Sequence, residues 1–107
     1  MVKEKNWLFQ VSCKNKQEAQ KIGKILLNEK LIACANIIPK MESMYWWSEK
    51  IEQSTESLLV GKTTKKLSKK VEKRIQELHS YNSPCIEFIE IQTNAKCANW
   101  ISQVTQK

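Results

Sequence analysis

The chain of 107 residues contains no aspartate, a single histidine, two glycines and two prolines. Its eleven acidic residues are therefore all glutamates. Nucleophilic catalysis needs a serine, cysteine or threonine within reach of a base that a third group orients. The sequence places no serine or cysteine beside such a base, so we predict that the protein is not an enzyme.

The cysteines are few and scattered, at Cys13, Cys34, Cys85 and Cys97. None belongs to a C-x-x-C pair, the spacing typical of zinc ribbons and thioredoxin-type sites. Long apolar runs and an apolar segment near the N-terminus are also missing, which argues against a membrane span and a signal peptide. We therefore expect a cytoplasmic protein without a membrane partner, whose thiols stay reduced and mostly serve as small buried side chains.

A length of 107 residues corresponds to one domain, so we predict a single domain over residues 1–107. The net charge is +7, and the basic excess is concentrated in residues 62–74. Such a cluster attracts anionic partners, but its lysines fall between apolar positions, as on the solvated face of a helix. Residues 56–62, a strand that an RNA-recognition module would use, contain no aromatic ring for base stacking. We therefore do not expect nucleic acid as a partner.

Strand and helix signals alternate through the first half of the chain. Residues 7–13 alternate with a period of two, which predicts a strand with one buried face. Asn15 and Glu18 have the spacing of a helix capping box, and apolar residues follow at helical spacing. Residues 31–47 predict a long strand that is bulged or edge-like at Pro39, because proline cannot donate a ladder hydrogen bond.

The second half begins with a hairpin. Residues 48–49 are its predicted turn, and residues 50–62 return as its second long strand. Apolar side chains in residues 67–78 are four, four and three positions apart and lie on one helix face. Residues 86–93 predict a further strand, and Asn94 can cap a short last helix.

The first six of these elements match the ferredoxin-like β-α-β-β-α-β pattern, and an extra C-terminal helix follows. We predict an α+β sandwich in which the helices cover one face of an antiparallel sheet. The other face carries tryptophan, leucine and isoleucine side chains, an apolar patch too large for a soluble monomer. We expect another subunit to cover it.

Several blocks in order resemble the CutA family of divalent-cation tolerance proteins, over about residues 7–104. The blocks are residues 31–39 (LIACANIIP), the spaced polar and aromatic positions of residues 45–63, and residues 78–84 (LHSYNSP), with a later echo at residues 99–101. The resemblance implies a ferredoxin-like protomer in a homotrimer whose long hairpins pair with neighbouring subunits. It also implies a non-enzymatic role in tolerance and homeostasis of copper or other divalent ions.

The resemblance implies Cys34 and His79 as metal ligands, because both match positions linked to metal ions in the family. A thiolate and an imidazole suit Cu or Zn, and no ion is expected to be needed for folding. A further cysteine of bacterial members aligns with Val11, and Cys13 lies two residues later on the same strand face. The alternative interpretation is that His79 only bonds to the last carbonyls of a helix.

The alternative function is a small-ligand-binding signalling or protein-anchoring trimer, similar to PII-type proteins. Its ligand would occupy a cleft between subunits, to which the resemblance assigns Trp47, Glu56, Lys62 and Tyr81. An apolar wall with a few convergent polar groups is typical of such a site. The same side chains are equally suited to packing in a subunit interface.

The chain departs from the family pattern at two positions. Glu49 stands where the family usually has glycine, and a side chain disfavours the positive φ that glycine adopts there. We expect another turn type or backbone strain. Ser80 stands where the family usually has proline, which frees φ and adds a backbone N–H. We expect a more mobile loop.

Overall fold

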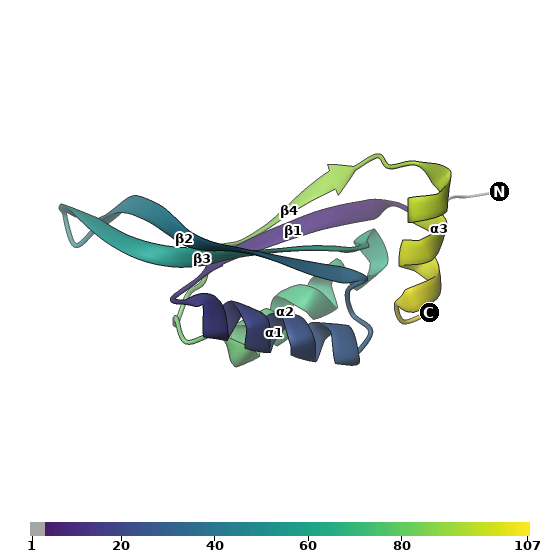
Figure 1. Cartoon of the computed structure of the whole chain (residues 1–107), viewed down its shortest axis with the longest axis horizontal. Coiled ribbons are helices and arrows are strands. Elements are labelled where there is room, and N and C mark those ends of the chain that lie inside the picture. Colours follow the sequence, from purple (N-terminus) through teal and green to yellow (C-terminus); the bar gives the residue numbers. More distant parts are fainter. Residues whose placement is uncertain (1–3) are drawn as a thin grey trace.

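The sheet has four antiparallel strands in the order β2-β3-β1-β4, as Figure 1 shows. The computed structural model describes residues 4–107. Its elements are β1 (Asn6–Cys13), α1 (Lys16–Asn28), β2 (Cys34–Trp47), β3 (Lys50–Thr64), a 3-10 turn (Lys65–Leu67), α2 (Ser68–Leu78), β4 (Ile86–Ile91) and α3 (Ala95–Val104). The predicted ferredoxin-like order with an extra C-terminal helix is confirmed.

The core lies between the sheet and the helices α1 and α2, which cover the same face (Figure 1). β1 buries every second side chain, Phe9, Val11 and Cys13, as its period-2 pattern predicts. The helices add an apolar stripe that includes Ala19, Ile22, Leu26, Val71 and Ile75. The lysines of α2 are exposed between these positions, which confirms the solvated basic helix face.

Local signals fix both ends of α1. The Asn15 side chain accepts a hydrogen bond from the Glu18 amide at 2.9 Å, and Glu18 Oε1 accepts one from the Lys14 amide at 3.0 Å. The predicted capping box is thus present, with its return bond one residue earlier than usual. At the other end Lys30 has φ 58°, and the Leu31 amide donates to the Leu26 carbonyl at 3.0 Å. Because of this closure β2 begins at Cys34, three residues later than the predicted start at residue 31.

The hairpin of β2 and β3 is bulged where Pro39 predicted it. Ile38 pairs with Leu58 and Met41 with Glu56, so β2 holds one more residue than β3 between these pairs. An extra residue in one strand is a β-bulge, which bends and twists the hairpin.

The turn of the hairpin has the two left-handed residues of a type I′ geometry. Ser48 has φ 50° and Glu49 has φ 65°. This turn matches the twist of the strands but favours asparagine and glycine. Of the two expected outcomes at Glu49 the structure shows strain, which costs about 1 kcal/mol.

The end of the hairpin projects beyond the helices (Figure 1). It carries large apolar side chains. Met44, Trp46, Trp47 and Ile51 are 71%, 73%, 68% and 65% exposed. Such a cluster of large exposed side chains is the mark of an interaction surface. None of the helices in residues 4–107 has the length and apolarity that crossing a membrane requires.

We predict that Gly61→Ala lowers the free energy of unfolding by about 2–3 kcal/mol, an overpacking cost. A Cβ atom at Gly61 would lie 2.6 Å from Phe9 Cζ and 2.7 Å from the Cys34 carbonyl oxygen. Urea denaturation at one fixed protomer concentration measures the change.

Gly23→Ala is the matched control. Its Cβ atom would lie 3.1 Å from the Cβ of Ala35, and the helix propensity of alanine offsets this tight contact. We expect a change within about 1 kcal/mol of zero. Equal effects of the two substitutions would contradict the close approach at Gly61.

Candidate functional site

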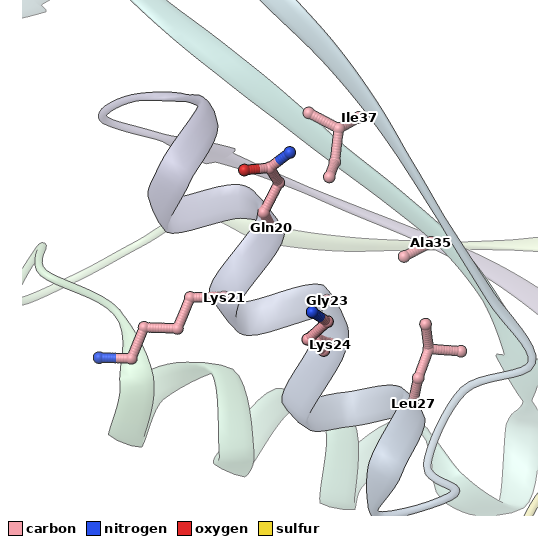
Figure 2. Close-up of a pocket in the computed structure, with 7 residues that line it drawn as sticks. All are labelled: Gln20, Lys21, Gly23, Lys24, Leu27, Ala35 and Ile37. Atoms are coloured by element: carbon pink, nitrogen blue, oxygen red, sulfur yellow. The ribbon is translucent and has the colours of Figure 1, made fainter.

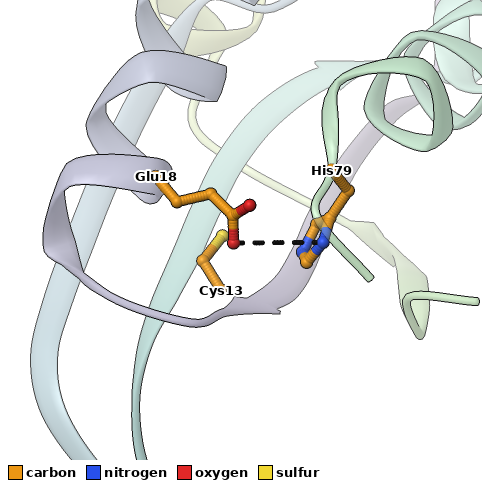
Figure 3. A group of neighbouring side chains, drawn as sticks. All are labelled: Cys13, Glu18 and His79. Carbon is orange, nitrogen blue, oxygen red and sulfur yellow. Dashed lines mark ion pairs between the residues drawn. The ribbon is translucent and has the colours of Figure 1, made fainter. Parts of the chain in front are cut away.

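Three side chains with metal-binding atoms meet beside the end of β1. Figure 3 shows Cys13, Glu18 and His79 pointing toward one another from β1, α1 and the residue after α2. The Cys13 sulfur, a carboxylate oxygen of Glu18 and a ring nitrogen of His79 lie within 4.8 Å of one another. Within residues 4–107 no other group of three such residues meets this condition.

Hydrogen bonds fix the tautomer of the His79 ring. Nε2 lies 2.8 Å from the carbonyl oxygen of Ser12, and a carbonyl only accepts, so Nε2 carries the hydrogen. Nδ1 then holds a lone pair, which accepts the Tyr81 amide at 3.0 Å. The ring therefore bonds to β1 and to its own loop, not to the last carbonyls of α2.

Glu18 supplies a carboxylate that stays ionised although it is largely buried. Burial alone would raise its pKa, but the hydrogen bonds from Ser80 and Lys14 outweigh this and lower the pKa. The Ser80 amide lies 2.9 Å from Oε2 of Glu18. The N–H that this chain gains by having serine in place of proline is therefore used to hold the carboxylate.

Cys13 is completely buried, and its thiol resists ionisation. Burial, with smaller contributions from the charges of Glu18 and Glu56, raises the pKa of Cys13 to about 12. The thiol is thus protonated at neutral pH. A metal ion that binds the sulfur has to displace this proton.

The three residues fit a borderline divalent ion. Sulfur, nitrogen and oxygen donors are the ligands of Zn²⁺, and copper also favours thiolate and imidazole. The Nε2–H bond of His79 to a backbone carbonyl is the outer contact that metal-binding histidines usually make. A thiolate and a carboxylate would balance two positive charges.

The structure does not bring Cys34 and His79 together within one protomer. Cys34 pairs with Lys62, whereas Cys13 pairs with Ser57, five positions earlier in β3. Five strand residues span about 17 Å, and an odd number of steps reverses the face of the sheet. The Cys34 sulfur instead lies 3.8 Å from Lys62 Nζ.

Three of the four predicted cleft residues share one groove of about 940 Å³ between the hairpin and the loop before β4. Tyr81 Oη donates a hydrogen bond to Glu56 Oε2 at 2.7 Å, and Trp47 stands at the hairpin end of the groove. Burial and then the bond to Glu56 raise the pKa of Tyr81. Lys62 does not line this groove, because it pairs with Cys34.

A second hollow of about 450 Å³ lies between α1 and β2 (Figure 2). Figure 2 shows Leu27 and Gln20 reaching toward the strand, while Lys21 points away from it. Its lining has no thiol, imidazole or carboxylate, so it offers a metal ion no suitable donor set; the lining residues are Gln20, Lys21, Gly23, Lys24, Leu27, Ala35 and Ile37.

Comparison with known proteins gives one consistent result. The family model of the CutA1 divalent ion tolerance protein matches residues 7–104. The divalent-cation tolerance protein CutA of Archaeoglobus fulgidus is 36% identical over 94% of this chain and 98% of its own length.

Solved structures show the same fold. CutA1 of Ehrlichia chaffeensis superposes with a TM-score of 0.93 at 33% identity, covering 99% of this chain and 100% of that one. The periplasmic divalent cation tolerance protein CutA of Archaeoglobus fulgidus gives a TM-score of 0.91 at 33% identity, covering 94% and 99%. This chain therefore belongs to the CutA1 family of divalent ion tolerance proteins.

Proposed function

We propose that the protein is a non-enzymatic homotrimer that binds copper or another divalent ion in metal tolerance and homeostasis. The observation that carries the proposal is the convergence of Cys13, Glu18 and His79 within 4.8 Å. Membership in the divalent ion tolerance family supports the same class of ligand. In this proposal His79 is a ligand, as the family resemblance implies, and Cys13 takes the place of Cys34 as its thiol partner.

The chemistry of the site favours binding over catalysis. A thiol with a pKa of about 12 is a poor nucleophile at neutral pH. Both ring nitrogens of His79 are engaged in the ion-free protein, one as donor and one as acceptor, so the ring is not a free base there. An ion that binds here replaces the thiol proton of Cys13 and displaces the Tyr81 amide from the Nδ1 lone pair.

The exposed hairpin supports the trimer. β2 is an edge strand of the sheet, and a long unpaired edge tends to pair with another chain. Its apolar end gives such a contact the large side chains that subunit interfaces favour.

The second candidate function is the binding of a small ligand or an anchored protein partner in the groove. The hydrogen bond from Tyr81 to the buried Glu56 favours this alternative, since it places a polar anchor beside the aromatic wall of Tyr45, Trp46 and Trp47. A few placed polar groups on an apolar wall are typical of ligand sites.

We also propose the cytoplasm as the compartment. A reducing environment keeps the Cys13 thiol available for an ion. Because the Archaeoglobus fulgidus structure is named periplasmic, fractionation of the native cells is the appropriate test.

We predict that the ion-free protein binds one Zn²⁺ or copper ion per protomer, and that Cys13→Ser weakens binding at least tenfold. Glu18→Gln and His79→Gln should act in the same direction, since each removes one donor of the set. Calorimetric titration with a competing chelator measures the affinities, and melting curves check that each variant folds.

Cys34→Ser is the control for a cysteine outside the site, and we expect it to leave the affinity unchanged. Loss of binding in Cys34→Ser together with normal binding in Cys13→Ser would transfer the site to Cys34. Weak uptake without stoichiometry would favour the groove function.

We predict that one proton leaves per ion bound between pH 7 and 8, so the apparent affinity rises about tenfold over that pH unit. The thiol pKa of about 12 means that Cys13 is protonated before the ion arrives, whereas the lowered pKa of Glu18 leaves no proton there. Titrations in buffers of different ionisation enthalpy count the protons. An affinity that does not change with pH would show that the Cys13 sulfur is not a ligand.

We predict that Trp47→Ala weakens trimer assembly by about 2 kcal/mol per subunit, because a large aromatic contact is lost from an interface. Trp47 is 68% exposed in the protomer, and Trp100→Ala, on α3, is the control at 41% exposure. Light scattering over a dilution series gives the oligomeric state. A trimer that persists in Trp47→Ala to the same dilution as in the unaltered protein would contradict the prediction.

A further inference from the structure

Tyr81 connects the metal site to the groove through three contacts. Its backbone amide donates to His79 Nδ1 at 3.0 Å, and its hydroxyl donates to Glu56 at 2.7 Å. Its ring packs against the His79 ring with centroids 4.7 Å apart. Tyr81 also lines the groove together with Asn82 and Ser83.

The lone pair of His79 Nδ1 can bind either the Tyr81 amide or a metal ion, but not both. Nε2–H is committed to the Ser12 carbonyl, so Nδ1 is the nitrogen available to an ion. It is also the nitrogen that lies 4.0 Å from Glu18 Oε1. A single in-plane lone pair cannot bind a metal ion and accept the Tyr81 amide together.

The other hydrogen bonds of the site do not face this conflict. A carboxylate offers about four acceptor positions, so Glu18 can bind an ion and still accept the Lys14 and Ser80 amides. The Cys13 sulfur makes only a long contact of 4.0 Å to the Val11 carbonyl. Of the contacts around the ion, the bond from the Tyr81 amide is therefore the one that must break.

We propose that metal binding releases the Tyr81 loop, residues 81–83, and opens the groove at Glu56, while the Ser80 amide stays on Glu18. This inference rests on the proposed metal function and concerns the regulation of the same site. The ion takes Nδ1 from the Tyr81 amide, the loop loses its anchor on the histidine, and the phenol no longer holds the carboxylate. Coupling of two sites is reciprocal, so a ligand that keeps Tyr81 on Glu56 weakens metal binding by the same factor.

Opening the loop exposes the Glu56 carboxylate to a ligand in the groove. Glu56 is 8% exposed and makes no ion pair within residues 4–107, so the Tyr81 hydroxyl is the donor that satisfies it. No lysine or arginine is among the described residues that line the groove. Removal of the phenol leaves a carboxylate beside the aromatic wall, ready for a donor group of a ligand. The metal-bound form is the one that offers this anchor.

The first test follows hydrogen exchange of individual backbone amides by NMR, with the assembled protein ion-free and saturated with Zn²⁺. We expect exchange of the Tyr81 amide to accelerate at least tenfold when the ion binds. The His79 amide, which donates to the Ile75 carbonyl at 2.9 Å, is the control and should not change. Unchanged protection of the Tyr81 amide at saturation would overturn the proposal.

The second test compares Zn²⁺ affinity in Tyr81→Phe and Tyr45→Phe. Removing the Tyr81 hydroxyl weakens the closed loop that competes with the ion, so Zn²⁺ should bind about tenfold more tightly. Tyr45 also lines the groove, but its hydroxyl contacts Ser54 at 3.3 Å and no residue of the metal site, so its variant should bind Zn²⁺ normally.

The outcomes separate this inference from the proposed function. If Zn²⁺ binds stoichiometrically and is lost in Cys13→Ser, while Tyr81→Phe leaves the affinity unchanged, the coupling is wrong and the metal site stands. If Cys13→Ser leaves Zn²⁺ binding unchanged, both the proposed site and its coupling to Tyr81 are wrong.

Discussion

The two hydrogen bonds of the His79 ring are the contacts on which the candidate site depends. The Ser12 carbonyl receives Nε2–H, and the Tyr81 amide donates to Nδ1. Together they tie the end of β1, the end of α2 and the loop before β4 into one unit. They also fix the tautomer, so the lone pair lies on the nitrogen beside Glu18. Without this fixed ring the thiol and the carboxylate would have no third donor.

Much of the fold follows from local rules that the sequence displays. The alternation in β1, the Asn15 and Glu18 capping box and the bulge beside Pro39 each depend on neighbouring residues only. The convergence of Cys13, Glu18 and His79 depends instead on how α1 and α2 pack against the sheet. Two features of the sequence pointed to this cluster: Cys13 ends the buried face of β1, and Glu18 lies in the first turn of the next helix.

Within one protomer, strand geometry separates two sets of predicted site residues. Glu56 and Lys62 are six positions apart on β3, about 20 Å, and only Glu56 lines the groove of the protomer. The separation of Cys34 from His79 does not follow from sequence spacing. It requires the register of β2 and β1 against β3. The family resemblance identified Cys34 as a candidate ligand. Only the strand register shows that Cys34 lies on the other face of the sheet from Cys13.

The buried charge of the candidate site suits both an ion-free and an ion-bound state. In the ion-free state the site holds a single negative charge, on Glu18, and the Lys14 and Ser80 amides satisfy it. The neutral thiol of Cys13 adds no second charge. A divalent ion would bring two positive charges and would expel one proton, so the bound site would be electrically neutral without any new residue. The Ser80 amide is central to this balance, because a proline at that position would leave the buried carboxylate with one donor fewer.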